Sequence, residues 1–458
     1  MSSQLKQGQV GSSQMQVMLL DENMKPRTTG DGAANLTEFV SQLVLEESID
    51  FPCIRGTMVF QDSADLIDSL LGNEFWQISV QTPQKKESYA YVLQCHAITD
   101  RVKRDKTNIY TIHLVSPEFL VNEVKNVFGS FKDRTFANHV DRIIKNQEDG
   151  LGSSKKKRFI EQTKSQPKFV IPNWRPFDAI AWMAKHAVRD AAGSGDKPQG
   201  AFVFFENQKG FHFKSLDQLC KDAREQNNCF HYFYGPKKLS DVSGQDYFAI
   251  SNVSFPKTYD TLANLRNGTW AGYSMELNLS QFTKSKMTTA SKDVEFKSVY
   301  YDIASYYKRM ENLKKNGEMP VDTEYNATTQ MYTRTPKRVK YGLSPANLYT
   351  GMGNEESYKK NDNTNNNDMN DPELRAYNYM RRYVLEQIQL QVEVPGNLEL
   401  RAGEGIEIDI PTSLQESRRQ ALDKLYSGRY IIAGVRHTFN TTNCVTTCML
   451  YKDYVDKS

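Results

Sequence analysis

The sequence predicts an α+β protein, mostly β, in which two small antiparallel β-barrels flank an α/β region. Three observations lead to this prediction. Short apolar or alternating runs separated by polar turns fill the first 120 residues, and similar runs return in the last 80 residues. Between them, apolar residues recur at helical spacing. A long polar stretch rich in Asn and Asp then precedes the last strands, which indicates a loop-rich insertion.

The chain is too long for a single hydrophobic core. With 458 residues, it is expected to contain several domains, whose boundaries we place where the periodicity changes. The expected units are a polar N-terminal tail at 1–14, a first barrel at 15–120, an α/β domain at 121–240, a second barrel at 241–299 and 376–458, and a helical and loop-rich insertion at 300–375.

The first barrel is expected from short runs that alternate or are largely apolar. Turn-forming polar clusters separate these runs, as in small sandwiches and barrels. A short helix is expected at 62–71, where Asp62 can cap its first turn. The predicted strands begin at Met15 and continue at 54–60, 76–80, 88–97 and 109–115.

The α/β region is expected to contain two amphipathic helices and two strands. One helix covers the apolar residues from Phe136 to Ile144, and the other covers 177–188, with Pro176 fitting its first turn. The two strands follow at 201–206 and 210–216.

The second barrel is expected from strands on both sides of the insertion. Strict alternation at 388–394 and 405–410 is typical of half-buried strands. We expect the C-terminal strands to pair with those before the insertion, and we expect a helix at 299–315. The remaining predicted strands are 247–253, 269–279, 429–439 and 444–455.

Bulk composition narrows the class of protein. Fifty-eight basic residues against 55 acidic residues give a net charge of +3, far from the clustered excess of a dedicated nucleic-acid binder. Six scattered cysteines are typical of reduced thiols. No secretion signal and no membrane span is expected, so the chain should be made and assembled in the cytoplasm.

Two strands carry residue pairs that could be chemical sites. Glu407 and Asp409 share one strand face, about 6.6 Å apart at the rise of a strand, like a glycosidase carboxylate pair. The alternative is that Glu407 and Asp409 lie on a solvated strand face opposite three isoleucines, and the alternating pattern favours this interpretation.

Cys444 and Cys448 point the same way on one strand, about 13 Å apart, which is too far for a disulfide or a shared metal. We expect them to pack in a core or interface.

Two segments carry residues that could bind a metal ion. Cys220 and Cys229 lie near His212 and His231 in the sequence, but they lack the tight Cys-x-x-Cys spacing of a zinc site. The segment 361–371 presents carboxylate and amide oxygens in a calcium-loop order, but Asn367 stands where the loop requires glycine. We expect no metal and a mobile loop.

The chain offers no recognisable catalytic motif. The basic run at 155–158, KKKR, could contact phosphate, although a solvated surface is the simpler interpretation. No phosphate-binding loop, nucleophile elbow or zinc-protease motif occurs. We therefore predict that the protein is not an enzyme and has neither catalytic residues nor a cofactor.

Two consecutive segments, VIPNWRPFDAIAWMAKHA at 170–187 and AFVFFENQKGFHFKSL at 201–216, resemble the baseplate hub proteins of contractile-tailed bacteriophages. In such proteins an extended stretch rich in proline and aromatic residues leads into a short helix. Arg175 stands here where a Ser or Thr cap would be conventional. The structural motif that carries the resemblance comprises Pro172, Trp174, Pro176 and Phe177, which we expect to fix and anchor the helix.

The C-terminal segments PGNLELRAGEGIEIDIP and SGRYIIAGVRHTFNTTNCVTTCMLYKD also resemble hub proteins. The resemblance implies two tube-like barrels per subunit, and a homotrimer that forms a pseudo-sixfold ring between a hexameric tail tube and a trimeric central spike. It further implies a place in the virion tail baseplate, surrounding wedge proteins as partners, and DNA only in transit through the lumen.

Three other functions remain open at this point. The chain could be the hub of a related contractile injection system. A cell-wall hydrolase would require a carboxylate or metal set, and a nucleic-acid-binding barrel protein would depend on the KKKR run and exposed aromatic residues.

Overall fold

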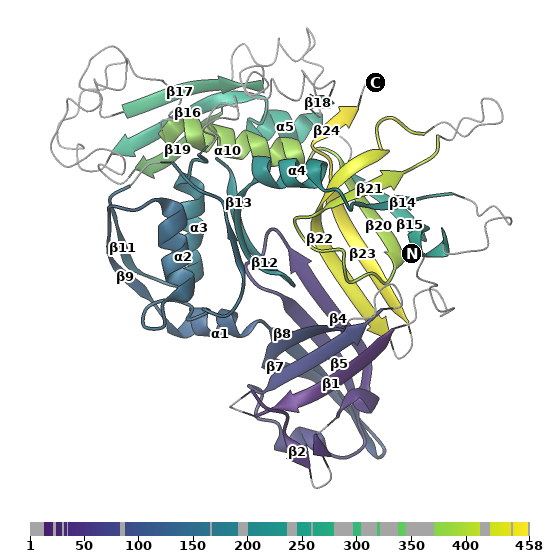
Figure 1. Ribbon diagram of the computed structural model, residues 1–458. Helices are drawn as coiled ribbons and strands as arrows, with labels where there is room; N and C mark the ends of the chain where they lie inside the picture. Colours follow the sequence, from purple (N-terminus) through teal and green to yellow (C-terminus); the bar gives the residue numbers. More distant parts are fainter. Residues whose placement is uncertain are drawn as a thin grey trace.

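The computed structural model describes most of the chain, and Figure 1 shows how its elements are arranged. The described residues are 13–21, 24–29, 32–33, 35–82, 88–164, 167–190, 200–235, 245–257, 260–278, 296–303, 318–320, 338–344, 371–412, 422–440 and 443–456.

One large sheet of twelve strands forms the body of the molecule. Its order is β1-β6-β7-β8-β5-β4-β22-β23-β20-β15, and β21 pairs with both β22 and β14. Only the β14–β21 pair is parallel among these pairings. The strands are β1 (Gln14–Leu20), β4 (Val40–Ser48), β5 (Arg55–Asp62), β6 (Phe75–Gln81), β7 (Tyr89–Arg104), β8 (Thr107–Val115), β14 (Phe230–Phe233), β15 (Asn252–Lys257), β20 (Gln389–Pro395), β21 (Gly405–Asp409), β22 (Gly428–Asn440) and β23 (Cys444–Tyr451).

Within the described residues, one seam joins the N-terminal strands of this sheet to the C-terminal strands. Strand β4 pairs antiparallel with β22, from Gln42 opposite Asn440 to Ser48 opposite Gly434. Figure 1 shows the purple β4 beside the yellow β22. The two predicted strand groups therefore continue into one another within one sheet.

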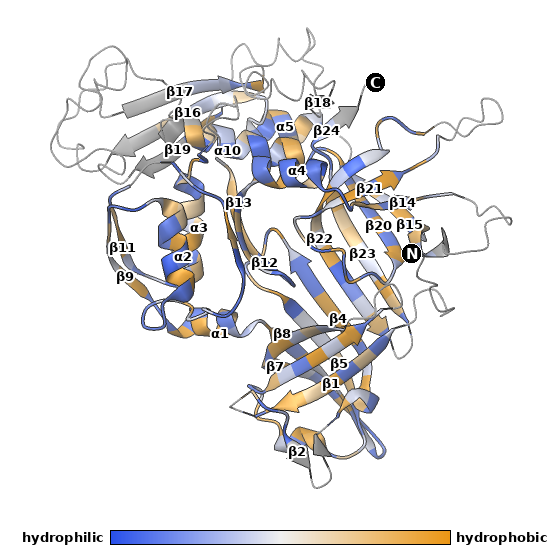
Figure 2. Cartoon of the chain, viewed as in Figure 1, coloured by the Kyte–Doolittle hydropathy of each residue, from blue (hydrophilic) through white to orange (hydrophobic). Residues whose placement is uncertain are grey.

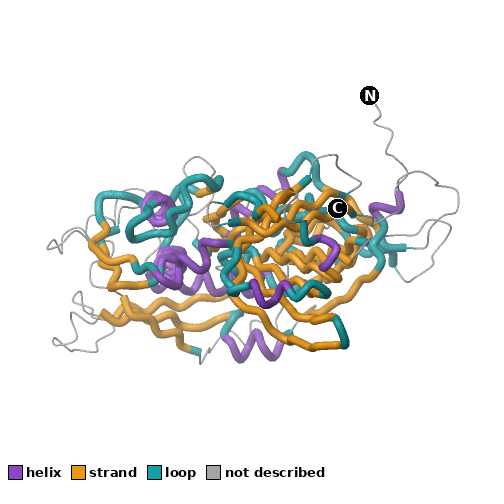
Figure 3. Tube along the Cα trace, turned by 90° about the horizontal axis from the view of Figure 1, so that it is seen from below, coloured by secondary structure: helices purple, strands orange, loops and turns teal. Residues whose placement is uncertain are grey.

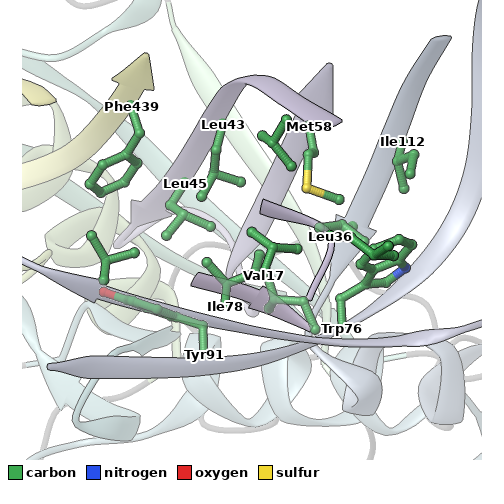
Figure 4. Packing of buried hydrophobic residues seen from close by; sticks show 14 of the residues in the cluster. Val17, Leu36, Leu43, Leu45, Met58, Trp76, Ile78, Tyr91, Ile112 and Phe439 are labelled. Carbon is green, nitrogen blue, oxygen red and sulfur yellow. The ribbon is translucent and has the colours of Figure 1, made fainter. Parts of the chain in front are cut away.

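The N-terminal strands enclose an apolar core. Trp76, Phe60 and Tyr110 are completely buried in it, and the Phe60 ring centroid lies 5.8 Å from that of Trp76. Phe439 of β22 reaches the same core, and Figure 4 shows it facing Leu43 and Leu45. Along β6, buried and half-buried residues alternate because successive side chains point to opposite faces of a strand. Figure 2 shows this alternation as changes of hydropathy along the strands.

The α/β region has a separate core. A two-stranded ribbon of β9 and β11 covers one side of helices α2 and α3, and β12 and β13 lie on the other side (Figure 1). Phe136, Ile143 and Ile180 are fully or almost fully buried between these layers. The elements are α1 (Pro117–Val124), β9 (Val127–Phe131), α2 (Phe136–Lys145), β10 (Arg158–Ile160), β11 (Phe169–Trp174), α3 (Pro176–His186), β12 (Phe202–Asn207), β13 (Gly210–Ser215) and α4 (Leu216–Glu225).

A third layer consists of three strands and two helices. Strand β16 pairs antiparallel with β17 and parallel with β19, and helix α10 packs on this sheet. The elements are α5 (Thr261–Asn267), β16 (Ala271–Asn278), β17 (Phe296–Asp302), β19 (Val339–Ser344) and α10 (Asp371–Leu385).

Short elements complete the described fold. Viewed from below, the molecule is thinner than it is wide (Figure 3). These elements are β2 (Thr28–Thr29), β3 (Gly32–Ala33), β18 (Glu318–Pro320), β24 (Tyr454–Asp456), and the 3-10 helices η1 (Thr37–Phe39), η2 (Leu66–Ser69) and η3 (Gln245–Phe248).

The predicted class, α+β with mostly β structure, is confirmed, with three local corrections. The helix expected at 299–315 is wrong at its start, because Phe296–Asp302 is strand β17. The segment 269–279 does not pair with the C-terminal strands, whereas β15 does, through β20. The helix expected at 62–71 shrinks to η2, with Asp62 remaining in β5. The segment 361–371 lies outside the described residues except for its last residue, where α10 begins.

Candidate assembly site

The motif that carried the resemblance lies where β11 turns into α3. Pro176 and Phe177 occupy the first turn of the helix and are buried. Trp174 is half-buried, with its ring centroid 5.9 Å from that of Trp182. Pro172 is exposed on β11. The four residues thus lie together along the chain but divide between the core and the surface.

The start of α3 is capped from another helix. Arg175 is the N-cap residue, but its side chain accepts no hydrogen bond from the helix. The Phe177 N–H instead donates to Asn122 Oδ1 on α1, 2.7 Å away. Arg175 forms ion pairs with Glu123 and Asp178. Asn122 therefore satisfies a helix-end donor that a Ser or Thr cap would otherwise satisfy.

Lys156 of the basic run forms a half-buried junction between the α/β region and the first strand group. Lys156 Nζ lies 2.6 Å from Glu118 on α1 and 2.5 Å from Glu206 on β12. Ser153 donates to Glu118, and the Ile54 N–H, directly before β5, donates to Glu206. Burial lowers the pKa of Lys156, but the two carboxylates outweigh this effect and hold it above its ordinary value.

The remaining residues of the run divide between two environments. Arg158 donates from Nε to Asp141 on α2 at 2.9 Å and to backbone carbonyls of the same loop. Lys155 and Lys157 are exposed. The interpretation of the run as a solvated surface is therefore wrong for Lys156 and Arg158.

A second junction centres on Glu47 at the end of β4. Its carboxylate accepts hydrogen bonds from the Gln208 N–H, in the β12–β13 turn, at 2.8 Å and from the Ala402 N–H, before β21, at 3.3 Å. It thereby connects both strand groups and the α/β region. Burial raises the pKa of Glu47 to about 8, although these two bonds and Arg401 oppose the shift.

A third junction centres on Arg381 of α10, which is completely buried. Its guanidinium lies 2.6 Å from Asp217 on α4 and 2.8 Å from Asp453, directly before β24. The Tyr377 hydroxyl donates to Asp217, and Arg224 pairs with Asp453 at 3.2 Å. The planar guanidinium suits two carboxylates at once, so it fixes α10 against α4 and the C-terminal segment.

The carboxylates considered for hydrolysis are each engaged separately. Asp409 lies 2.7 Å from His231, and Glu407 lies 3.5 Å from Arg429. His231 and Asp409 line a surface recess of about 400 Å³ with Phe233 and Phe248. An acid–base pair acting across one bond needs both carboxylates at the substrate, and only one of the two reaches this recess.

The candidate cysteines are divided among several elements of the fold. Cys444 and Cys448 are buried on β23, and Cys220 is buried in α4. Burial raises the pKa of both Cys95 and Cys229 to about 11, which disfavours the reactive thiolate. In the part of the chain that the structure describes, no cluster of three His, Cys, Asp or Glu side chains is arranged to hold a metal ion. Nor does any described helix combine the length and apolar character needed to cross a membrane.

Comparisons with known proteins agree with the sequence motif. The chain is 22% identical over 441 residues to the probable baseplate hub protein gp334 of Vibrio phage KVP40, covering 92% of each chain. The predicted resemblance to baseplate hub proteins is confirmed. No protein-family model matches the chain.

Solved structures of two tail proteins share the fold of this chain. A tail protein from Neisseria meningitidis MC58 superposes with a TM-score of 0.51 at 10% identity, covering 96% of this chain and 97% of that one. The 43 kDa tail protein of prophage MuSo2 from Shewanella oneidensis gives 0.51 at 7% identity, with 96% and 98% covered. Their similarity extends over almost the whole length of each chain.

Proposed function

We propose that this protein is a structural subunit of a phage tail baseplate hub, located in the virion, and that it is not an enzyme. Three copies would form a pseudo-sixfold ring that adapts a hexameric tail tube to a trimeric central spike. Wedge proteins would surround the ring, and DNA would pass only through its lumen. The similarity to a hub protein over 92% of both chains supports this proposal.

The observation that carries the proposal is the β4–β22 seam. An adaptor from threefold to sixfold symmetry needs two tube-like units in each subunit, held side by side. The seam joins two strand groups edge to edge within one sheet, and seven consecutive residue pairs fix their register. Such pairing holds the two groups at one relative position, as a ring of fixed size requires.

Strand β15 offers an edge at which a ring could close. It lies at the end of the sheet path and pairs with β20. Phe255 on this strand is 45% exposed, and its ring centroid lies 4.6 Å from that of Tyr426. The exposed Phe255 ring gives this edge an apolar side chain that is suited to packing against another subunit.

The three alternative functions named from the sequence have less support than a phage tail hub. The relative named above belongs to a phage, which favours a phage tail over another contractile injection system. A hydrolase is disfavoured because Glu407 and Asp409 hold separate partners. A nucleic-acid-binding role for the KKKR run is disfavoured because Lys156 and Arg158 neutralise carboxylates within the fold.

Light scattering on the purified full chain tests the proposal. The expected particle mass is three times the 52.5 kDa of one chain. Phe255→Asp should shift the particles towards monomers, because it places a charge at the proposed interface. Leu71→Asp is the matched control, since Leu71 is 84% exposed beside η2 and should leave the mass unchanged. A strictly monomeric parent at high micromolar concentration would contradict the hub proposal.

A further inference from the structure

The β9–β11 ribbon has one buried face and one exposed face. Phe131 and Phe169 lie directly opposite each other on the buried face, with ring centroids 5.2 Å apart, and pack against α2 and α3. The alternation of a strand sends Phe128 and Val170 to the opposite face. Phe128 is 71% exposed and Val170 is 63% exposed.

The centre of the exposed face is apolar except for Ser130, which lies directly opposite Val170. Pro172 continues it along β11, and Val124, at the end of α1 just before the ribbon, is 80% exposed. Scattered single apolar residues are ordinary on protein surfaces, whereas neighbouring ones on a single face indicate an interaction site. Within the described part of the chain, β9 and β11 pair only with each other, so no third strand extends the ribbon.

One end of the exposed face carries two uncompensated cations. Lys132 directly follows β9 and Lys168 directly precedes β11, so the register that pairs Phe131 with Phe169 brings them to the same end. Both are exposed, and neither forms an ion pair with another described residue. Asp133 and Arg134 follow with opposite charges, which leaves a net positive end. Like charges at neighbouring strand ends repel one another unless an anion lies between them.

At the opposite end of the ribbon the charges are paired. There the Arg175 guanidinium already pairs with Glu123 and Asp178. The charge of the exposed face therefore changes along the strands. One end carries balanced ion pairs, the centre is apolar, and the other end carries two lysines without ion pairs to described residues. Phe128 and Lys132 are four residues apart, which corresponds to about 13 Å along a strand.

We propose that this face is a docking site for an extended segment of another protein, in which apolar side chains are followed about four residues later by acidic ones. The apolar part packs on Phe128, Val170 and Pro172, and the acidic part lies between Lys132 and Lys168. The ribbon lies on the far side of α2 and α3 from the large sheet (Figure 1). This docking role goes beyond the proposed hub function, because it does not involve the β15 edge.

Fluorescence anisotropy with designed peptides tests the proposal on the full-length protein. The probe is a labelled peptide of alternating valines with two glutamates placed four residues after the valine that is meant to pack on Phe128. One control peptide has lysines in place of the glutamates, and another has the glutamates directly beside the valines. We expect the first peptide to bind at least tenfold more tightly than either control.

Variants of the protein identify the surface that binds. Phe128→Ser, and separately Lys132→Glu with Lys168→Glu, should each weaken binding of the glutamate peptide at least tenfold. The double charge reversal should also bind the lysine peptide more tightly than the parent does. Lys103→Glu is the matched control, since Lys103 is exposed on β7, and it should bind as the parent does. Light scattering should give the same particle mass for all of these proteins.

Three results would overturn the proposal. The first is no saturable binding of the glutamate peptide at millimolar concentration. The second is equal binding by the parent and by Phe128→Ser. The third is a smaller particle mass for Phe128→Ser, which would mean that a second copy of the chain covers this face. The β15 variants report on the hub ring separately, so the two proposals can fail independently.

Discussion

The interior of the first strand group and the junctions around it are stabilised in different ways. The strand group encloses an apolar core built on Trp76, Phe60 and Tyr110. The junctions between regions instead use polar side chains: the buried, hydrogen-bonded Glu47, the half-buried ion pairs of Lys156 and the buried ion pairs of Arg381. Apolar packing tolerates many arrangements, whereas buried ion pairs are favourable only when every partner is in place. Because the polar contacts of the junctions require specific partners, we infer that the junctions define how the regions are placed relative to one another.

The largest expected effect is at the Arg381 junction. Arg381→Ala leaves Asp217 and Asp453 buried without their shared cation, so we expect a loss of about 3–5 kcal/mol in the free energy of unfolding. Chemical denaturation measures it. Arg381→Met is the matched comparison, since it retains apolar volume but not charge. A loss below about 1 kcal/mol for Arg381→Ala would show that this junction does not fix α10.

The Lys156 junction should have a smaller effect. The Lys156 side chain is about one-third exposed, so solvent screens part of its attraction to Glu118 and Glu206. We expect Lys156→Ala to reduce the free energy of unfolding by about 1–3 kcal/mol. Lys157→Ala, at an exposed neighbour in the same run, is the matched control and should change it little. Equal effects of the two substitutions would mean that the ion pairs of Lys156 contribute no more to stability than the exposed Lys157 side chain does.

Some of this organisation could be predicted from the sequence. The C-terminal strands follow their alternation closely because one face of each is buried, and β20, β21, β22 and β23 all lie where alternation placed them. The β4–β22 seam could not be predicted. It pairs residues about 390 positions apart, such as Arg436 and Glu46, and local periodicity carries no information about such pairing.

The polar junctions were harder to predict, although the sequence of α10 carries one signal for the Arg381 junction. In α10 the buried residues Leu374, Tyr377 and Val384 follow the spacing of one helical face, and Arg381 occupies the same face. A charge within an apolar stripe indicates a buried ion pair. Lys156 offered no such signal, because the basic run resembles a solvated loop until Glu118 and Glu206 fold against it.

Glu47 should make stability depend on pH. Its pKa is raised from 4.5 to about 8 in the folded protein, so the folded state binds more protons than the unfolded state between these values. Stability from this group is therefore present below pH 4.5 and is lost as the pH rises towards 8, by up to about 1.4 kcal/mol per pH unit. Denaturation at pH 6 and pH 7 measures this slope. Glu47→Gln should reduce it, and an unchanged slope in the variant would mean that other groups cause it.

The smallest effect is expected at the exposed ion pair on the seam itself. Arg436 and Glu46 lie opposite each other on β22 and β4, with Nη2 and Oε1 2.5 Å apart, but the Arg436 side chain is 61% exposed. Exposed pairs contribute little because water screens them and both side chains lose freedom. Arg436→Ala should therefore lower the free energy of unfolding by less than about 1 kcal/mol. The backbone hydrogen bonds of the seam remain in this variant, so its particle mass should equal that of the parent. A loss comparable to that of Arg381→Ala would instead mean that side-chain charge also holds the two strand groups together.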